Sequence, residues 1–159
     1  MVKNKFGFTI IELLISISII LIFSGISLPY YNKYSQEIKL QNEVKKLISV
    51  IELAKKKAIS SDLYQSCDNF SGYKIIINAD NYSFRFGCAG VYQNVQTYNF
   101  PTNISVISGT GNFTFKPLGI GTNIAIGAIR LKNSSLNQCL EISITTNGIL
   151  ETGNIDSCL

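Results

Sequence analysis

The sequence predicts an α+β protein in which a long N-terminal helix packs on an antiparallel β-sheet head. Three observations support this fold class. The chain begins with a strongly apolar run, which is followed by apolar residues at helical spacing. From about residue 60 onward, short alternating segments are separated by turn residues. A length of 159 residues allows one domain with an anchor.

The apolar run extends from Phe8 to Leu28, and Glu12 is its only charged residue. As a helix, this run is roughly 30 Å long, which is the thickness of a bilayer core. A carboxylate at the centre of a bilayer costs about 2.5–3.5 kcal/mol on insertion scales, so Glu12 calls for an explanation. It is either an acid tolerated near the headgroups or a charge that pairs with an opposite charge on a neighbouring subunit.

The residues around Glu12 resemble a known processing signal. The stretch from Lys5 to Ile15, KFGFTIIELLI, resembles the class III signal of type IV pilins and type II secretion pseudopilins. The resemblance implies that a prepilin peptidase/methyltransferase cuts between Gly7 and Phe8 and N-methylates Phe8. It also implies that Glu12 pairs with the N-terminal amine of the adjacent subunit in a filament. Such a pair is reasonable physically, because two buried opposite charges offset each other's desolvation.

We therefore expect four segments: a leader peptide (1–7), a membrane-spanning or filament-core helix (8–28), an amphipathic stem helix (29–60) and a β-rich globular head (61–159). An ordinary signal peptide is the alternative, because Gly25-Ile26-Ser27 has suitably small residues and cleavage there would leave a soluble head starting at Leu28. Glu12, inside the apolar run, argues against that alternative.

The expected location is the bacterial inner membrane, with a single pass and the head outside the cytoplasm, followed by a pilus or periplasmic pseudopilus. Lysine positions alone are ambiguous. Lys3 and Lys5 favour a cytoplasmic N-terminus, whereas the lysines that follow the run favour the reverse. The four cysteines suit an oxidising compartment. We therefore expect the head to lie outside the cytoplasm.

Pro29 interrupts what would otherwise be one helix from Phe8 to about Ser60, so we expect a kink there. The alternative is that Pro29 ends the membrane helix. In the stem, apolar residues at three- and four-residue steps predict a buried stripe, which consists of Val44, Leu47, Ile48, Ile51, Ala54 and Ala58. The opposite face carries Lys45, Lys46, Glu52 and Lys56 and should be solvated.

The head is predicted to contain about eight strands, with a hairpin turn at 78–81 and a second turn near Asn147-Gly148. The predicted strands are 73–78, 82–88, 91–100, 104–107, 113–116, 125–132, 139–145 and 149–152.

The hairpins also predict how the four cysteines pair. Across an antiparallel hairpin, the first turn brings Cys67 close to Cys88, and the second turn brings Cys139 close to Cys158. Of three possible connectivities, these two disulfides are therefore expected. The second also resembles the C-terminal disulfide loop of many pilins.

No catalytic, metal or cofactor site is expected. The chain has no histidine and no pair of cysteines at metal-ligand spacing. No spacing of serine, lysine or carboxylate residues supports an enzyme.

The head is similar, over short stretches, to the H-type pseudopilin and FimT-type minor pilin group. These stretches are 113–119, 128–131 and 142–150. Members of that group that bind DNA tend to have arginines after the last glycine. Here Gly148 is followed by Ile149, Leu150 and Glu151, and the head is slightly acidic, so nucleic-acid binding is doubtful.

The resulting functional prediction is a structural subunit, a minor pilin or pseudopilin. It would be assembled with other pilin or pseudopilin subunits by the pilus or secretion machinery in the membrane. The alternative is a pilus-borne binding subunit for DNA uptake or adhesion.

Overall fold

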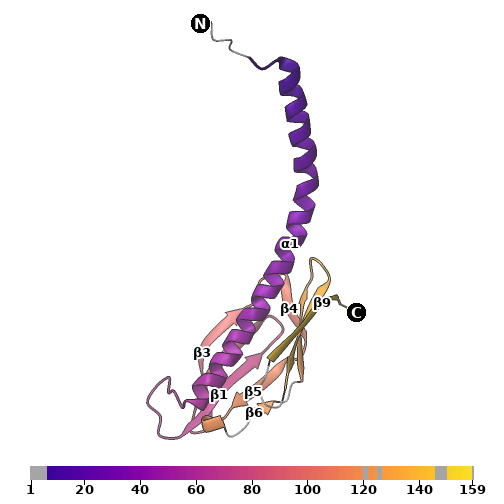
Figure 1. Cartoon of the computed structure of the whole chain (residues 1–159). Coiled ribbons are helices and arrows are strands. Elements are labelled where there is room, and N and C mark those ends of the chain that lie inside the picture. The colour runs from indigo at the N-terminus through magenta and orange to yellow at the C-terminus, as the bar shows by residue number, and fades with distance from the viewer. Residues whose placement is uncertain (1–6, 120–121, 125–126, 146–149, 159) are drawn as a thin grey trace, which may run out of the picture. The chain divides into compact units, whose positions relative to one another are not determined.

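The computed structural model describes residues 7–119, 122–124, 127–145 and 150–158 (Figure 1). It contains one long helix and nine described strands, in agreement with the predicted α+β class. The chain divides into two compact units, with the boundary between Ser35 and Gln36. The elements are α1 (Ile10–Ile59), β1 (Phe70–Ile77), β2 (Asn81–Cys88), β3 (Val91–Asn99), β4 (Ile104–Ser108), β5 (Gly111–Phe115), η1 (Pro117–Gly119), β6 (Thr122–Ile124), β7 (Ala128–Asn133), β8 (Gln138–Ile144) and β9 (Leu150–Ser157).

The first part of α1 is apolar and its described side chains are exposed. By length and composition, α1 is the one helix among the described residues that is suited to cross a membrane. Serine hydroxyls within this apolar part bond to the backbone four residues earlier: Ser16 Oγ donates to the Glu12 carbonyl at 2.7 Å and Ser18 Oγ to the Leu14 carbonyl at 2.8 Å. These bonds satisfy the hydroxyl groups within the helix itself.

The helix continues through Pro29, so it does not end there as the alternative interpretation required. A kink at this residue stays a prediction.

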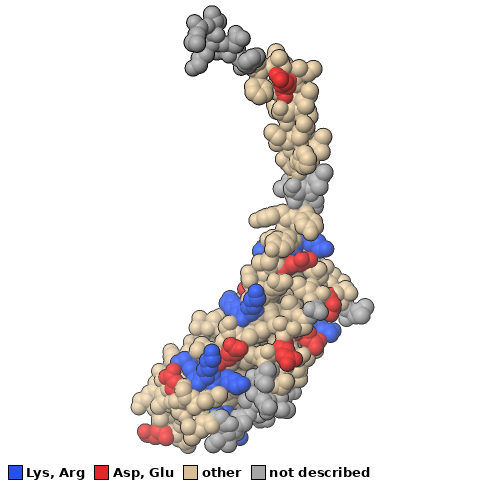
Figure 2. All heavy atoms as spheres, in the orientation of Figure 1, with Lys and Arg blue, Asp and Glu red and all other residues tan. Residues whose placement is uncertain are grey.

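In the second unit, α1 packs its apolar stripe on the β-structure, as predicted. Val44, Leu47, Ile51, Ala54 and Ala58 are buried, and they belong to one core that also includes strands of both sheets. Leu40 and Val50 extend this buried face beyond the prediction, and Ile48 is half-buried. The face with Lys45, Lys46, Glu52 and Lys56 is exposed, and Figure 2 shows basic side chains along this part of the helix.

The described strands form two antiparallel sheets. The five-stranded sheet has the order β3-β2-β1-β5-β6, and the four-stranded sheet has the order β4-β7-β8-β9. The chain therefore changes sheet three times among the described strands: between β3 and β4, between β4 and β5, and between β6 and β7. Because inner-face residues from both sheets enter the core beside α1, the two sheets and the helix share a single hydrophobic interior.

The predicted strands agree with the observed ones, with shifts at their ends. The turn at 78–81 is confirmed, since Asn78 N donates to the Asn81 carbonyl at 2.8 Å. The short strand β6 was not predicted, and β9 extends beyond the predicted 149–152. Residues 125, 126 and 149 and the predicted turn at Asn147-Gly148 lie outside the described residues.

Two buried tyrosines differ in how their hydroxyl groups are satisfied. The Tyr73 hydroxyl donates to the Asp62 carbonyl at 2.6 Å, whereas the Tyr82 hydroxyl is buried and has no hydrogen-bond partner among the described residues. Burial raises the pKa of Tyr82, and the nearby Glu43 carboxylate raises it further. The Tyr82 hydroxyl therefore stays neutral at physiological pH and makes no compensating bond.

We expect Tyr82→Phe to leave the free energy of unfolding unchanged or to raise it by about 1 kcal/mol, because it removes a buried polar group without breaking a bond. The matched change Tyr73→Phe should lower this free energy by about 1 kcal/mol, because it removes a formed hydrogen bond. Denaturant unfolding of the full chain in detergent measures both. If both variants lost the same free energy of unfolding, the conclusion that only the Tyr73 hydroxyl is hydrogen-bonded would be wrong.

Candidate functional site

The peptide bond between Gly7 and Phe8 lies just before α1, in a segment without regular structure. Phe8 is 83% exposed, and a Cβ atom added at Gly7 would meet no atom within 4 Å. The bond is therefore accessible from outside. The packing of the described residues therefore does not require glycine at position 7.

The start of α1 is capped by Thr9 and Glu12. Glu12 Oε2 accepts hydrogen bonds from Thr9 N at 2.9 Å and from Thr9 Oγ1 at 2.7 Å. In return, Glu12 N donates to Thr9 Oγ1 at 3.3 Å. This reciprocal arrangement is a capping box, which satisfies backbone donors that the first helical turn leaves unpaired.

The capping box fixes the direction of the carboxylate. The Glu12 side chain turns back toward Thr9 and the chain start, at the helix end where the macrodipole favours a negative charge. Among the described residues, none of the ion pairs includes Glu12. Thr9 was not predicted as a site residue, although the spacing of threonine and glutamate three residues apart is a known sequence signature of this cap.

The structure places the predicted site residues in two groups. Gly7, Phe8, Glu12 and Pro29 belong to the N-terminal unit, and all four cysteines belong to the second unit. The described residues contain no group of three or more histidine, cysteine, aspartate or glutamate side chains arranged to hold a metal ion.

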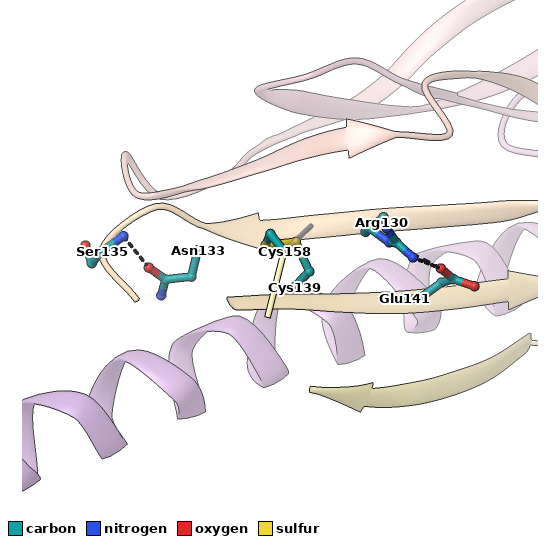
Figure 3. The surroundings of a disulfide bond; sticks show 6 residues. All are labelled: Arg130, Asn133, Ser135, Cys139, Glu141 and Cys158. Carbon is teal, nitrogen blue, oxygen red and sulfur yellow. Dashed lines mark hydrogen bonds and ion pairs between the residues drawn. A yellow bond between two sulfur atoms is a disulfide. The ribbon is translucent and has the colours of Figure 1, made fainter. Parts of the chain in front are cut away.

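The cysteines form the two predicted disulfides. Cys67 bonds to Cys88 with a Cα–Cα distance of 6.0 Å and joins the segment before β1 to the end of β2. Cys139 bonds to Cys158 with a Cα–Cα distance of 5.2 Å and joins β8 to the residue after β9 (Figure 3). Each bond thus fastens the outer end of a pair of neighbouring strands.

The four-stranded sheet also carries an exposed ion pair near the second disulfide. Arg130 on β7 donates to Glu141 Oε2 on β8 from Nη2 at 2.9 Å and from Nε at 3.3 Å (Figure 3). A comparable pair joins Lys57 to Asp62 at the end of α1, and the hydrogen bond to Asp62 raises the pKa of Lys57. Both pairs are partly exposed, so each contributes little to stability.

Two side-chain amides, one buried and one half-buried, connect α1 to the four-stranded sheet. Asn133, which is fully buried, donates from Nδ2 to the Gln36 carbonyl at 3.1 Å. Its Oδ1 accepts a bond from Ser135 N at 3.0 Å (Figure 3). Gln138 Nε2 donates to Glu37 Oε1 at 3.0 Å. These bonds set the position of the helix along the sheet.

Comparison with known families identifies the N-terminal segment. Residues 2–28 match the model of the prokaryotic N-terminal methylation motif. No characterised protein and no solved structure is significantly similar to the chain. The match covers Gly7, Phe8, Thr9 and Glu12, the residues that lie at the accessible bond and at the helix cap.

We expect removal of either disulfide, by Cys139→Ser with Cys158→Ser or by Cys67→Ser with Cys88→Ser, to lower the free energy of unfolding by about 3 kcal/mol. The physical reason is that each bond closes a loop of about 20 residues (sequence separations 19 and 21) and restricts the unfolded chain. Denaturant unfolding of the oxidised full chain in detergent measures the loss.

The control is Arg130→Ala, which removes an exposed ion pair and should cost less than about 1 kcal/mol. If the disulfide variants lost no more free energy of unfolding than this control, the conclusion that the disulfides stabilise the head would be wrong.

Proposed function

We infer that this chain, which carries the class III prepilin signal of type IV pilins and pseudopilins, is a minor subunit of a type IV pilus or of a type II secretion pseudopilus. The observation that carries this inference is the methylation motif at residues 2–28, with an accessible Gly7–Phe8 bond and a carboxylate at the adjacent helix end. A structural, non-enzymatic role fits a signal whose known use is filament assembly.

The first step of the proposed function is processing. A prepilin peptidase hydrolyses the Gly7–Phe8 bond, which releases the leader 1–7 and turns the Phe8 amide nitrogen into an amine; the methyltransferase then methylates this amine. The accessible bond supports the step, because the peptidase needs an extended segment. Glycine at position 7 meets no requirement of this chain's packing, and its role is to fit the enzyme.

The second step is assembly from the inner membrane, with the head outside the cytoplasm. The first part of α1 packs with other pilin or pseudopilin helices, and membrane-bound assembly machinery drives extrusion. We propose that Glu12 pairs with the Phe8 amine of the adjacent subunit. In this pair each charge offsets the desolvation of the other, whereas either one alone is costly in an apolar environment.

Within the family, we propose that the head is similar to those of the H-type pseudopilins and FimT-type minor pilins. The support is the resemblance of the segment 113–119, in which β5 leads directly into the tight turn of η1. This assignment favours a minor subunit over the main building block of the fibre.

We expect the protein recovered from its native membrane to begin at N-methylated Phe8. Its intact mass, measured without reduction, should be four hydrogens below the reduced value because of the two disulfides. Mass spectrometry with N-terminal sequencing tests this expectation. A chain starting at Leu28 would instead indicate ordinary signal-peptide cleavage, and the filament function would then be wrong.

We expect Glu12→Ala to abolish incorporation into filaments while leaving membrane insertion intact, because the change removes the acid that pairs with the neighbouring amine and makes the run more apolar. Co-purification of the variant with sheared filaments, alongside membrane fractionation, measures both properties.

Ser18→Ala is the matched control, since it removes a polar group from the same helix that bonds within its own chain. It should incorporate normally. Normal incorporation of Glu12→Ala would disprove the proposed role of the acid.

A further inference from the structure

The outer face of the five-stranded sheet, which points away from the core, carries two cations side by side. In the strand register, Lys74 of β1 lies directly opposite Arg85 of β2. Asn94 of β3 flanks Arg85, and Thr114 of β5 flanks Lys74, so the four residues form one row across four strands. We call Lys74, Arg85, Asn94 and Thr114 the cationic row. Their neighbours along β1 and β2, including Tyr73, Ile75, Phe84 and Phe86, point into the core.

Like charges directly opposite each other on neighbouring strands are destabilising. The sheet reduces this cost by turning the two side chains apart. Lys74 Nζ lies over the Tyr92 ring at 3.8 Å from its centroid, and Arg85 Nε donates to Ser83 Oγ at 3.3 Å. Neither contact supplies an opposite charge.

The absence of a side chain at Gly87 makes this geometry possible. A Cβ atom there would lie 2.6 Å from Tyr92 Cε1, so the tyrosine ring packs directly against the glycine. The Lys74 amine lies over the same ring. The ring thus holds Lys74 in place by a cation–π contact.

Carboxylates are missing from the cationic row, and within the described part of the chain neither Lys74 nor Arg85 forms an ion pair. Other cations behave differently: Lys46 pairs with Glu43, Lys57 with Asp62 and Arg130 with Glu141. A further exposed cation, Lys116, follows β5 and lies close to β1, because a Cβ atom at Gly72 would be 3.2 Å from the Lys116 Cα atom. This side of the sheet is therefore positive, although the head as a whole is slightly acidic.

We propose that the cationic row docks a carboxylate-bearing surface on the head of the adjacent subunit in the filament. Arg85 and Lys74 would bind the carboxylates, while the Asn94 amide and the Thr114 hydroxyl supply uncharged hydrogen-bonding groups at the rim. This head itself presents such carboxylates, since Glu151 and Asp156 are exposed on β9, the edge strand of the other sheet. This inference rests on the proposed filament function.

A protein partner fits this surface better than nucleic acid. Two central cations neutralise few phosphates, whereas strong phosphate binding uses many. Base stacking also needs an open aromatic face, and on this surface the Lys74 amine already lies over the Tyr92 ring.

The test is photo-cross-linking in assembled filaments, using the full chain in its native cells with p-benzoylphenylalanine at position 94. We expect an adduct with the head of another pilin-type subunit, in a peptide that contains aspartate or glutamate. The combination Lys74→Glu with Arg85→Glu should lower the yield about tenfold, because two attractions become repulsions.

The matched control is Lys132→Glu with Lys56→Glu, which changes the net charge equally and should alter the yield less than twofold. Co-purification with filaments and retention of both disulfides are measured for every variant.

The outcomes separate the two proposals. A chain that is present in filaments but forms no adduct at position 94 would overturn the docking surface alone, as would an adduct with nucleic acid, lipid or a peptide without acidic residues. An equal loss in the control would also overturn it, because net charge would then explain the effect. A chain that is absent from filaments would overturn the proposed function, and the docking surface with it.

Discussion

The burial of one face of α1 between Leu40 and Ala58 is the contact on which the rest of the head depends. The sheets contribute inner-face residues to the same core, which contains Leu47 and Ile51 of the helix as fully buried members. Each such aliphatic side chain contributes roughly 1.5–3 kcal/mol by its removal from water. Without the helix, the inner faces of both sheets would lose their cover, so a head fragment must include α1 from about Gln36 onward to fold.

Apolar burial alone does not set the position of the helix along the sheets, because an aliphatic stripe tolerates sliding. The buried Asn133 amide removes this freedom by bonding the Gln36 carbonyl, and Gln138 bonds Glu37 nearby. A buried amide without its partner costs about 1–3 kcal/mol, so a shifted helix would be penalised. Not all buried polar groups are satisfied in this way, as the Tyr82 hydroxyl shows. Helix position is therefore fixed at a few points rather than along the whole interface.

Local patterns predicted most of the elements and the disulfides but not the division into two sheets. The spacing of Val44, Leu47 and Ile51 identifies the buried helix face, and the turn at 78–81 fixes the register that brings Cys67 to Cys88. These are short-range features. The pairing of β1 with β5 and of β4 with β7 joins segments far apart in sequence, and no local pattern encodes which sheet a strand enters.

The candidate sites show the same limit. The motif around Glu12 is local and can be predicted from the sequence, and the Thr9 cap also has a local signature. The cationic row was missed because it combines four strands. A count of charges along the chain indicates a slightly acidic head, whereas the register of β1 and β2 sets Lys74 against Arg85. Charge arrangement on a sheet thus depends on pairing that the sequence alone does not supply.

The N-terminal unit is under a different constraint from the head. Lipid and neighbouring helices shield its exposed apolar side chains from water equally well. Hydrophobicity alone therefore does not favour filament assembly over storage in a membrane. On the proposed pathway, Glu12 is the group that distinguishes the two environments. Before processing, its carboxylate accepts two bonds from Thr9, which reduces its cost without supplying a counter-charge. On the proposed pathway, cleavage at Phe8 creates the missing positive charge, and full neutralisation then requires a second subunit.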